Sequence, residues 1–341
     1  RRQRQMCIRD RLSLWRLAAW PLQQLMPAAI QFYGDGHAWA YRHFSAQPGE
    51  VVLALLAVIL LVSPTSRAVK GLALVLFLPL VLPAAPGQDT TDLATRVTVL
   101  DVGQGTAVVI QAGPRVLLYD TGGGDPAGAT MATAVVLPYL RARGVSALDT
   151  FVISHPDRDH SAGAAAVLQA VPVQRLRFGD RPPGVEGGRL CIAGQAWRWP
   201  GGQHFQFLSP AQEQGLSRND RSCVLQVRLG DYRLLLPGDI ENARERDLVR
   251  YWREGLRSDW LLLAHHGSAT SSSPALLKAV QPRTVVINSG YANRFGHPHP
   301  DVMRRVRSRG LDIYATADGG ALEFEFHPDR EPIVNVYRRQ R

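Results

Sequence analysis

Residues 150–160 read TFVISHPDRDH, an apolar, β-rich run that ends in a dense cluster of polar side chains. His155, Asp157, Asp159 and His160 are four potential metal ligands that lie directly after an expected strand and before an expected helix. A strand end followed by a tight turn can aim alternate side chains at one point, and mixed carboxylates and imidazoles suit Zn, Mn or Fe. The alternative is a polar loop in which Asp159 caps the next helix, but it leaves the other three unexplained. This stretch therefore predicts a metal site.

The chain on both sides of this stretch alternates short β-rich runs with helical patterns. Glycine-bounded runs of aliphatic and β-branched residues read as strands, and longer amphipathic runs read as helices. We expect strands over 96–103, 106–113, 115–122, 150–155, 173–178, 205–208, 222–229, 232–236, 260–266, 284–290, 311–315 and 321–326, and helices over 130–143, 161–170, 241–254, 273–280 and 300–309. This order favours an α/β domain in which two sheets pack face to face with helices outside.

Three further segments place polar residues directly after expected strands. They are Tyr119-Asp120-Thr121-Gly122, Leu236-Pro237-Gly238-Asp239 and Ala264-His265-His266-Gly267. Together with the first stretch, they resemble the ordered motifs of the metallo-β-lactamase superfamily, with Asp157 in place of the second histidine. The resemblance runs from residue 96 to about residue 326 and implies an αββα sandwich that binds two divalent metal ions.

A narrower resemblance rests on five segments in a fixed order. They are Asp101-Val102-Gly103-Gln104-Gly105, the His-x-Asp-x-Asp-His stretch, Asn219-x-x-Ser222-Cys223-Val224-Leu225, Ala264-His265-His266-Gly267-Ser268 and Gly296-His297-Pro298-His299-Pro300. These segments are similar to the C-terminal domain of the ComEC-type DNA-uptake channel family. The resemblance implies a competence protein whose phosphodiesterase or nuclease domain degrades the DNA strand that is not transported. It also implies four partners: DNA, as the single strand being degraded or imported, the inner membrane, other competence-machinery proteins and the remainder of the chain's own channel region.

The resemblance assigns roles to the candidate metal ligands. The expected ligands are His155, Asp157, Asp159, His160, Asp239, His265 and His266. The first two are expected to hold one ion and the next two the other, with Asp239 bridging them. On a strand, His265 and His266 point to opposite faces, so we expect one to ligate and the other to bind phosphate. Two such ions activate water and clamp the attacking and leaving oxygens, and Asp159 is also expected to accept a proton as a catalytic residue.

Other site residues are expected around these ligands. Either His297 or His299 is placed to stabilise the transition state or protonate the leaving group. The alternative is a proline-bracketed turn whose histidines are merely exposed. Asp101 and Gln104 lie on a glycine-rich turn, and either stabilise that turn or contact substrate. The expected substrate contacts are Asp101, Gln104, Asn219 and Ser268.

The sequence departs from the family pattern at two positions, and the second bears on the choice of metal. Thr106 stands where the family usually has an acid after the second glycine of Asp-Val-Gly-Gln-Gly. Asn219 falls near the place of a further histidine ligand, and an amide oxygen suits Mn or Mg better than Zn. The first metal site then has few imidazoles, so we expect two Mn²⁺ ions, with Zn²⁺ as the alternative.

The N-terminal part of the chain has a different composition. Residues 51–62 and 71–86 contain no charged side chain and are joined by a short polar segment. They predict a transmembrane helical hairpin, with two buried helices as the alternative. Arg67 and Lys70 in the connection place it in the cytoplasm by the positive-inside tendency. The hydrolase domain is then expected on the periplasmic side of the bacterial inner membrane.

The domain boundaries expected from these patterns divide the chain into four parts. They are residues 1–11, a non-native segment resembling a translated sequencing adapter; 12–86, the C-terminal end of a membrane channel domain; 87–95, a linker; and 96–341, the hydrolase domain. Cys191 and Cys223 lie in the last part. They form a disulfide or remain two buried thiols, depending on the compartment.

The net charge is consistent with a polyanionic partner without identifying one. Of the formal charge of +10, half lies in the first 16 residues, which hold six arginines and one aspartate. Two other functions stay open: a non-catalytic, metal-bearing DNA guide domain of the uptake channel, and a small-molecule metallo-hydrolase. Asp157 and the His-His-Gly run argue against the small-molecule hydrolase, since both occur in relatives that cut phosphodiesters.

Overall fold

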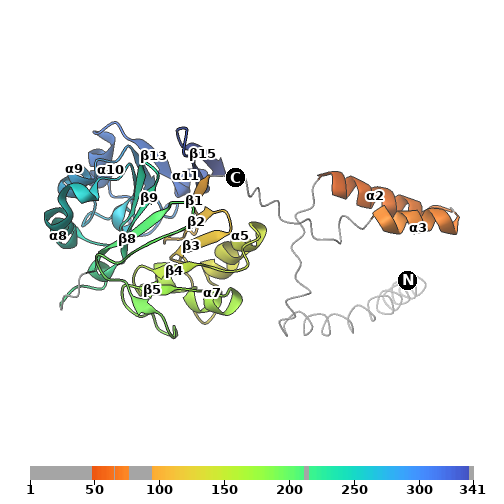
Figure 1. Ribbon diagram of the computed structural model, residues 1–341, viewed down its shortest axis with the longest axis horizontal. Helices are drawn as coiled ribbons and strands as arrows, with labels where there is room; N and C mark the ends of the chain where they lie inside the picture. The colour runs from red at the N-terminus through yellow and green to blue at the C-terminus, as the bar shows by residue number, and fades with distance from the viewer. Residues whose placement is uncertain (1–47, 65, 77–93, 211–214, 338–341) are drawn as a thin grey trace, which may run out of the picture. The chain divides into compact units, whose positions relative to one another are not determined.

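The computed structural model describes residues 48–64, 66–76, 94–210 and 215–337. The chain divides into two compact units, Arg1–Ala84 and Ala85–Arg341. In the first unit the described residues form two helices, α2 (Pro48–Val62) and α3 (Arg67–Leu76). The second unit holds every described strand (Figure 1).

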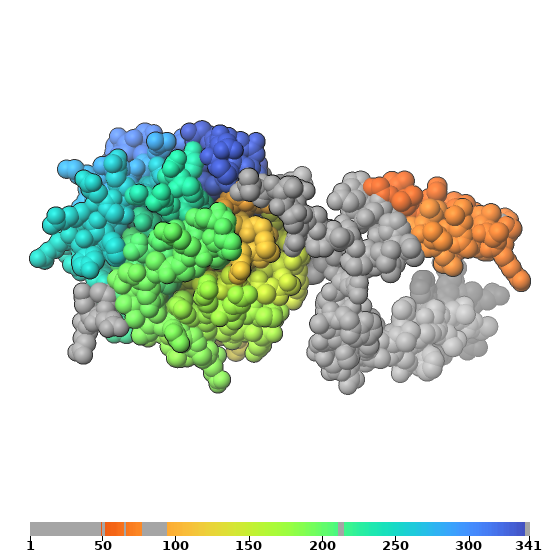
Figure 2. Space-filling view, viewed as in Figure 1, coloured from red at the N-terminus to blue at the C-terminus, as the bar shows by residue number. Residues whose placement is uncertain are grey.

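Two β-sheets form the centre of the second unit. The first has the strand order β15-β14-β1-β2-β3-β4-β5-β6, and the second has the order β13-β12-β11-β10-β9-β8-β7. The first sheet comprises β1 (Thr95–Val99), β2 (Val108–Ala112), β3 (Arg115–Tyr119), β4 (Thr150–Ile153), β5 (Leu176–Phe178), β6 (Arg189–Leu190), β14 (Ala321–Phe326) and β15 (Ile333–Tyr337). The second comprises β7 (Ala196–Arg198), β8 (His204–Ser209), β9 (Val224–Leu229), β10 (Tyr232–Leu236), β11 (Trp260–Leu262), β12 (Thr284–Ile287) and β13 (Asp312–Ala315). Strands β1 and β14 lie at opposite ends of the domain's sequence but pair antiparallel in the first sheet. Figure 2 accordingly shows the blue C-terminal residues beside the orange residues near β1.

Helices cover the outer face of each sheet and complete a four-layer sandwich (Figure 1). The helices that cover the first sheet are a π-helical turn, η1 (Ala132–Val136), and α5 (Leu137–Ala142) and α7 (Ala164–Ala170). Those that cover the second are α8 (Asn242–Trp252), α9 (Pro274–Val280) and α10 (Pro300–Arg307). The remaining short helical turns are α6 (Arg158–Ser161), η2 (Asn219–Arg221), η3 (Arg253–Leu256), η4 (Ala264–Gly267) and α11 (Thr316–Gly319).

The central strands of each sheet are apolar on both faces, and both of these faces are covered. Along β3, Leu117 and Tyr119 enter the core between the two sheets, whereas Leu118 packs under the helices of the first sheet. This alternation follows from the two-residue period of a β-strand. The expected αββα sandwich of the metallo-β-lactamase fold is therefore confirmed.

Parallel strand order brings the ligand-bearing segments together. Strands β3, β4 and β5 run parallel in one sheet, and β10, β11, β12 and β13 run parallel in the other. The carboxyl ends of parallel strands meet at one edge of a sheet, where ligands bind in open α/β sheets. The segments after β4, β10 and β11, which carry the expected ligands, all begin at such ends.

The expected transmembrane hairpin is not supported by the described residues. Helices α2 and α3 occupy parts of the two uncharged runs, but none of the helices in the described ranges is both long and apolar enough to cross a membrane. Residues 77–86 of the second run lie outside the described residues, as do the expected adapter segment 1–11 and most of the linker 87–95.

A disulfide bond joins Cys191, which follows β6, to Cys223, which precedes β9. The Cα atoms are 5.9 Å apart, and both side chains are buried in the core between the sheets. The choice that the sequence left open is thus decided in favour of the bonded pair. The bond ties an edge of the first sheet to the centre of the second.

Replacing both cysteines with alanine is expected to lower the free energy of unfolding by roughly 3–4 kcal/mol. A cross-link between residues separated by 32 positions restricts the unfolded chain by about that amount. Denaturant titration with and without a reductant would measure the effect. Reductant is expected to lower the free energy of unfolding of the unmodified chain and to leave that of the double variant unchanged. Equal unfolding midpoints for the two proteins would contradict a stabilising disulfide.

The structure differs from the expected elements at several places. The strand expected over 260–266 ends at Leu262, and the turn η4 follows it. Strands β6, β7 and β15 lie outside the expected strand ranges. β6 and β7 are two and three residues long, too short for a clear pattern, and β15 pairs antiparallel with β14 at the sheet edge.

Candidate metal centre

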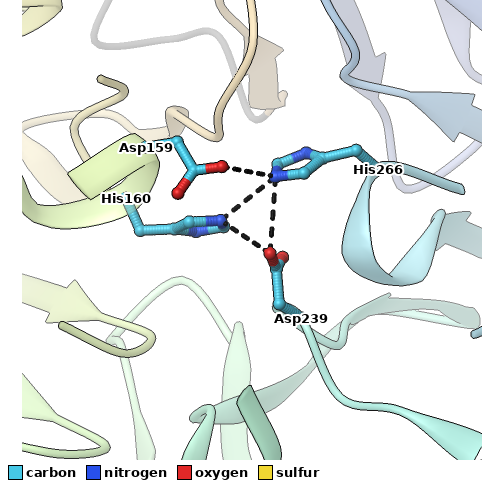
Figure 3. Close-up of side chains that lie close together, drawn as sticks. All are labelled: Asp159, His160, Asp239 and His266. Carbon is cyan, nitrogen blue, oxygen red and sulfur yellow. Dashed lines mark hydrogen bonds and ion pairs between the residues drawn. The ribbon is translucent and has the colours of Figure 1, made fainter. Parts of the chain in front are cut away.

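Four side chains from three strand ends converge on one point (Figure 3). Asp159 and His160 lie on α6 after β4, Asp239 follows β10, and His266 lies in the turn after β11. One potential ligand atom of each lies within 4.8 Å of the others. His160 Nε2 is 3.1 Å from Asp239 Oδ2, and His266 Nε2 is 3.4 Å from Asp159 Oδ2. By the family resemblance, Asp159, His160 and one of the two adjacent histidines are expected to hold the second metal ion, and Asp239 to bridge the two ions.

The turn η4 decides between the two adjacent histidines. The expectation that they lie on a strand is wrong: His265 and His266 have left-handed backbones, with φ of 49° and 53°. Such conformations are rare for residues with a side chain and concentrate at functional sites. His266 is buried and contacts Asp159 and His160. His265 is partly exposed; its Nε2 lies 3.7 Å from Asp239, and its Nδ1 lies 3.6 Å from Glu241. His266 is therefore the histidine that completes the cluster of four.

The first metal site is less fully assembled. His155 Nε2 lies 3.8 Å from Asp157 Oδ2 and 3.9 Å from Asp239 Oδ2. This buried nitrogen has no hydrogen-bond partner among the described residues, as expected of an imidazole that awaits a metal. Asp157, however, also accepts a hydrogen bond of 3.0 Å from the exposed Arg218. Asn219 begins η2, where its carbonyl oxygen accepts a hydrogen bond from the Ser222 amide.

Two buried residues that were not singled out as site residues hold the ligands in place. Asp120, at the end of β3, accepts hydrogen bonds from the Ser154 amide and hydroxyl at 2.6 and 2.7 Å and lies 2.7 Å from Nδ1 of His160. A carboxylate behind a histidine fixes its tautomer and turns the other nitrogen toward the metal. The Ser222 hydroxyl accepts a hydrogen bond from the Asp239 amide. The Tyr-Asp-Thr-Gly segment carried the signal for Asp120: an acid at a strand end beside an expected metal site.

Asp120→Asn is expected to weaken metal binding by roughly 10- to 100-fold, the usual cost of losing such a supporting carboxylate. Competition between the purified chain and a chromogenic chelator would measure the dissociation constant. Asp125→Asn provides the control, because Asp125 is exposed on the following loop. If both variants bind metal as tightly as the unmodified chain, Asp120 does not position His160.

The charges of the site favour a bound cation. Burial, followed by the neighbouring His160, lowers the pKa of His155 to about 4, so this imidazole is neutral. Burial raises the pKa of Asp239, but the surrounding histidines outweigh it and hold that pKa well below its usual value. Burial likewise lowers the pKa of His160, yet Asp239 and Asp120 raise it well above the ordinary range. The carboxylates thus retain a proton on His160, and a divalent ion would supply that positive charge instead.

The two histidines of the Gly-His-Pro-His-Pro segment have different places. The ring of His297 lies 5.7 Å from that of His265 and 6.5 Å from that of His266. Burial and then the charges of these two histidines lower its pKa. His299 instead caps α10, where its Nδ1 accepts a hydrogen bond from the Asp301 amide. Only His297 faces the cluster.

The residues expected to contact substrate lie in different places. Asp101 and Gln104 line a cavity of about 1070 Å³ that reaches Asp159. Both also brace the backbone: Asp101 accepts a hydrogen bond from the Gly103 amide, and Gln104 accepts one from the Gly290 amide. The Ser268 hydroxyl is buried and lies 3.1 Å from that of Thr270, so the structure does not bring it into the cluster.

The fold and the cluster define a class of protein. Residues 100–289 match the family model described as the metallo-beta-lactamase superfamily, which is more than half of the chain. The domain is thus, in general terms, a metal-dependent hydrolase of that superfamily. Competence protein ComA of Neisseria gonorrhoeae is 39% identical over 276 residues, covering 80% of this chain and 38% of that protein. The chain belongs to the ComEC family of competence proteins.

Two other relatives support this assignment. Recombination protein 2 of Haemophilus influenzae is 38% identical over 239 residues, covering 70% of this chain and 30% of that protein. ComE operon protein 3 of Bacillus subtilis is 27% identical over 330 residues, covering 86% of this chain and 41% of that protein. The chain therefore spans less than half the length of these relatives.

Proposed function

We propose that the second unit hydrolyses phosphodiester bonds of DNA with the help of two divalent metal ions. The observation that carries this proposal is the convergence of Asp159, His160, Asp239 and His266 on one point that opens into a large cavity. Asp159 belongs to both, so a substrate in the cavity reaches the metal ligands directly. When bound, the ions supply the positive charge that activates water and neutralises a phosphate.

The ligand sets differ between the two proposed sites. Asp159, His160 and His266 would hold one ion and His155 and Asp157 the other, and Asp239 lies within 4 Å of His155, His160 and His266. The second set has a single imidazole, and oxygen-rich sets favour Mn²⁺ over Zn²⁺. We therefore propose Mn²⁺ as the preferred metal, with Zn²⁺ as the alternative.

The residues around the ions have separate tasks in this proposal. The Asp159 side chain is about one-third exposed and lines the cavity, so it is placed to orient water and accept its proton. His297 is half-buried beside the cluster and is placed to donate a hydrogen bond to the leaving oxygen. His265 keeps Nε2 near Asp239 and is placed to contact a phosphate oxygen.

The biological setting follows from the family. Relatives named as competence and recombination proteins support a role in DNA uptake. Within that role, the proposed task of the domain is to degrade the strand that is not imported. The proposed location is the periplasmic side of the bacterial inner membrane. The disulfide suits an oxidising compartment. The proposed partners are DNA, the remainder of the channel and other competence proteins.

The test is DNA cleavage by the purified 341-residue chain with Mn²⁺, Zn²⁺ or EDTA. Cleavage with Mn²⁺ that EDTA abolishes is expected, because the carboxylate-rich ligand set needs a cation. Asp159→Ala is expected to remove the activity, while Asp125→Asn on the exposed loop keeps it. Metal-dependent cleavage by Asp159→Ala at the unmodified rate would refute the proposed catalytic role.

A second function, a non-catalytic DNA guide, is favoured by one contact. Arg218 holds Asp157 in an ion pair, which competes with metal at the first site. If the chain binds DNA without cutting it under every metal, and Arg218→Ala does not restore cleavage, the guide function replaces the nuclease.

A further inference from the structure

A cavity of about 1070 Å³ lies beside the metal cluster, and its outer wall is a single aromatic loop. The lining comes from the turn after β1, the loop after β3, the start of α6, the loop after β12 and the turn α11. Its volume is at the upper end of the range for small-ligand sites, roughly 300–1,000 Å³. It therefore has room for more than a single phosphate group.

The loop after β12, residues 290–297, is held rigid from within by Asn293. The Asn293 side-chain amide donates to the carbonyl oxygens of Gly290 and His297. Its side-chain oxygen accepts hydrogen bonds from the amides of Phe295 and His297 at 3.2 and 3.0 Å. Four bonds from one side chain to backbone atoms brace the loop, so its backbone is preorganised before any ligand binds.

Two aromatic rings stand exposed on this braced loop. Tyr291 is 69% exposed and Phe295 is 54% exposed, and both line the cavity. Both rings lie at the cavity that reaches Asp159, so they are placed to contact a ligand bound there. Aromatic faces of this kind stack on nucleic-acid bases, at about 1–3 kcal/mol per base, with little regard to sequence.

Two arginines place positive charge at the same cavity. The Arg294 guanidinium lies 4.8 Å from the centre of the Phe295 ring. Arg158 lies across from this loop, where it donates a hydrogen bond of 2.8 Å to the Gly124 carbonyl. Both side chains are exposed and suit phosphate groups. Asp101 and Asp318 also line the cavity, so stacking rather than charge alone must supply the affinity.

The rings lead from the loop toward the metal ligands. The Phe295 ring stacks on His297 at 5.8 Å with an interplanar angle of 26°. His297 in turn stacks near His266, at 6.5 Å and 27°. A base stacked on Phe295 therefore lies close enough for an adjoining phosphate to approach the metal cluster.

We propose that this groove binds single-stranded DNA, with bases stacked on Tyr291 and Phe295 and phosphates beside Arg158 and Arg294. The inference rests on the proposed phosphodiesterase function and adds the surface and the four side chains that hold the strand. Bases inside a duplex already stack on one another and do not offer their faces to these rings. The groove thus selects an unpaired strand and delivers it to the metal cluster.

The test compares the unmodified chain with a Tyr291→Ala/Phe295→Ala double variant and with Tyr251→Ala. Tyr251 is a matched control, because it is 78% exposed on α8 and does not line the cavity. Affinity is measured by fluorescence anisotropy on a phosphorothioate-linked dodecathymidine and on a duplex of the same length. Cleavage is measured on single-stranded DNA and on bis(4-nitrophenyl) phosphate, a diester too small to span the groove.

The double variant is expected to bind the single strand at least tenfold more weakly, while its duplex affinity changes by less than about twofold. The ratio of kcat/KM for single-stranded DNA to that for the small diester is expected to fall at least tenfold. Tyr251→Ala should match the unmodified chain in every assay. The proposed groove would be refuted if the double variant bound the single strand as tightly as the unmodified chain does. It would also be refuted if the double variant lost affinity for the single strand and for the duplex by the same factor. If the unmodified chain does not hydrolyse the small diester, the phosphodiesterase proposal fails, while the anisotropy comparison still decides the groove.

Discussion

Asp239→Asn is expected to reduce metal-dependent phosphodiester hydrolysis by about a thousandfold or more, which corresponds to about 4 kcal/mol of transition-state stabilisation. Asp239 is the residue on which the cluster converges. His155, His160, His265 and His266 all have Nε2 between 3.1 and 3.9 Å from its Oδ2. Asparagine keeps the shape of the side chain but removes the charge that two cations would share. Metal affinity should fall with activity, as measured by chelator competition and by steady-state kinetics.

A matched control separates this effect from a general loss of charge. Asp247→Asn removes an aspartate that is 60% exposed on α8, and it should leave both measurements unchanged. Circular dichroism and thermal melting would establish that Asp239→Asn is folded. A folded Asp239→Asn protein that binds Mn²⁺ and cleaves DNA as the unmodified chain does would show that this cluster is not the metal centre.

Gly179→Ala is expected to be the most disruptive small substitution, lowering the free energy of unfolding by about 3 kcal/mol. Gly179 follows β5, where an added Cβ would lie less than 3.0 Å from the carbonyl oxygens of Ser154 and Arg221. Both contacts are backbone atoms, which cannot swing away as a side chain can. In a domain of this size the melting temperature should fall by roughly 6–12 °C.

The same substitution should also weaken metal binding, because the two displaced segments carry site residues. Ser154 precedes His155 and bonds to Asp120, and Arg221 precedes Ser222, which holds the Asp239 amide. Gly255→Ala is the control, since its Cβ would make only ordinary contacts of 3.8 Å with Trp252. Equal melting temperatures for the two variants would contradict the close approach at Gly179.

Local sequence patterns were sufficient for the layer order and for most residues of the candidate metal cluster. Runs such as 150–153 are apolar on both faces, so they predict buried strands, and the two-residue period then divides their side chains between two cores. Asp159, His160 and Asp239 follow such runs directly, and parallel strands end at a shared edge. Their meeting was therefore predictable, and the structure brings them together. The transmembrane hairpin, in contrast, rested on hydropathy alone and gains no support from α2 and α3.

The sequence by itself determined the fold class and the donor set, because strand ends and residue types are local properties. Only the tertiary structure decided which histidine completes the cluster, since the chain turns through left-handed backbones at His265 and His266 and buries only His266 fully. The next residue, Gly267, is closely packed, because an added Cβ would meet Pro298 and Leu263. The tertiary structure also decided that Asp120 supports His160 and that Cys191 meets Cys223. The aromatic wall of Tyr291 and Phe295 likewise appears only in three dimensions. These relations join residues far apart in the chain, and distance along a sequence does not report distance in space.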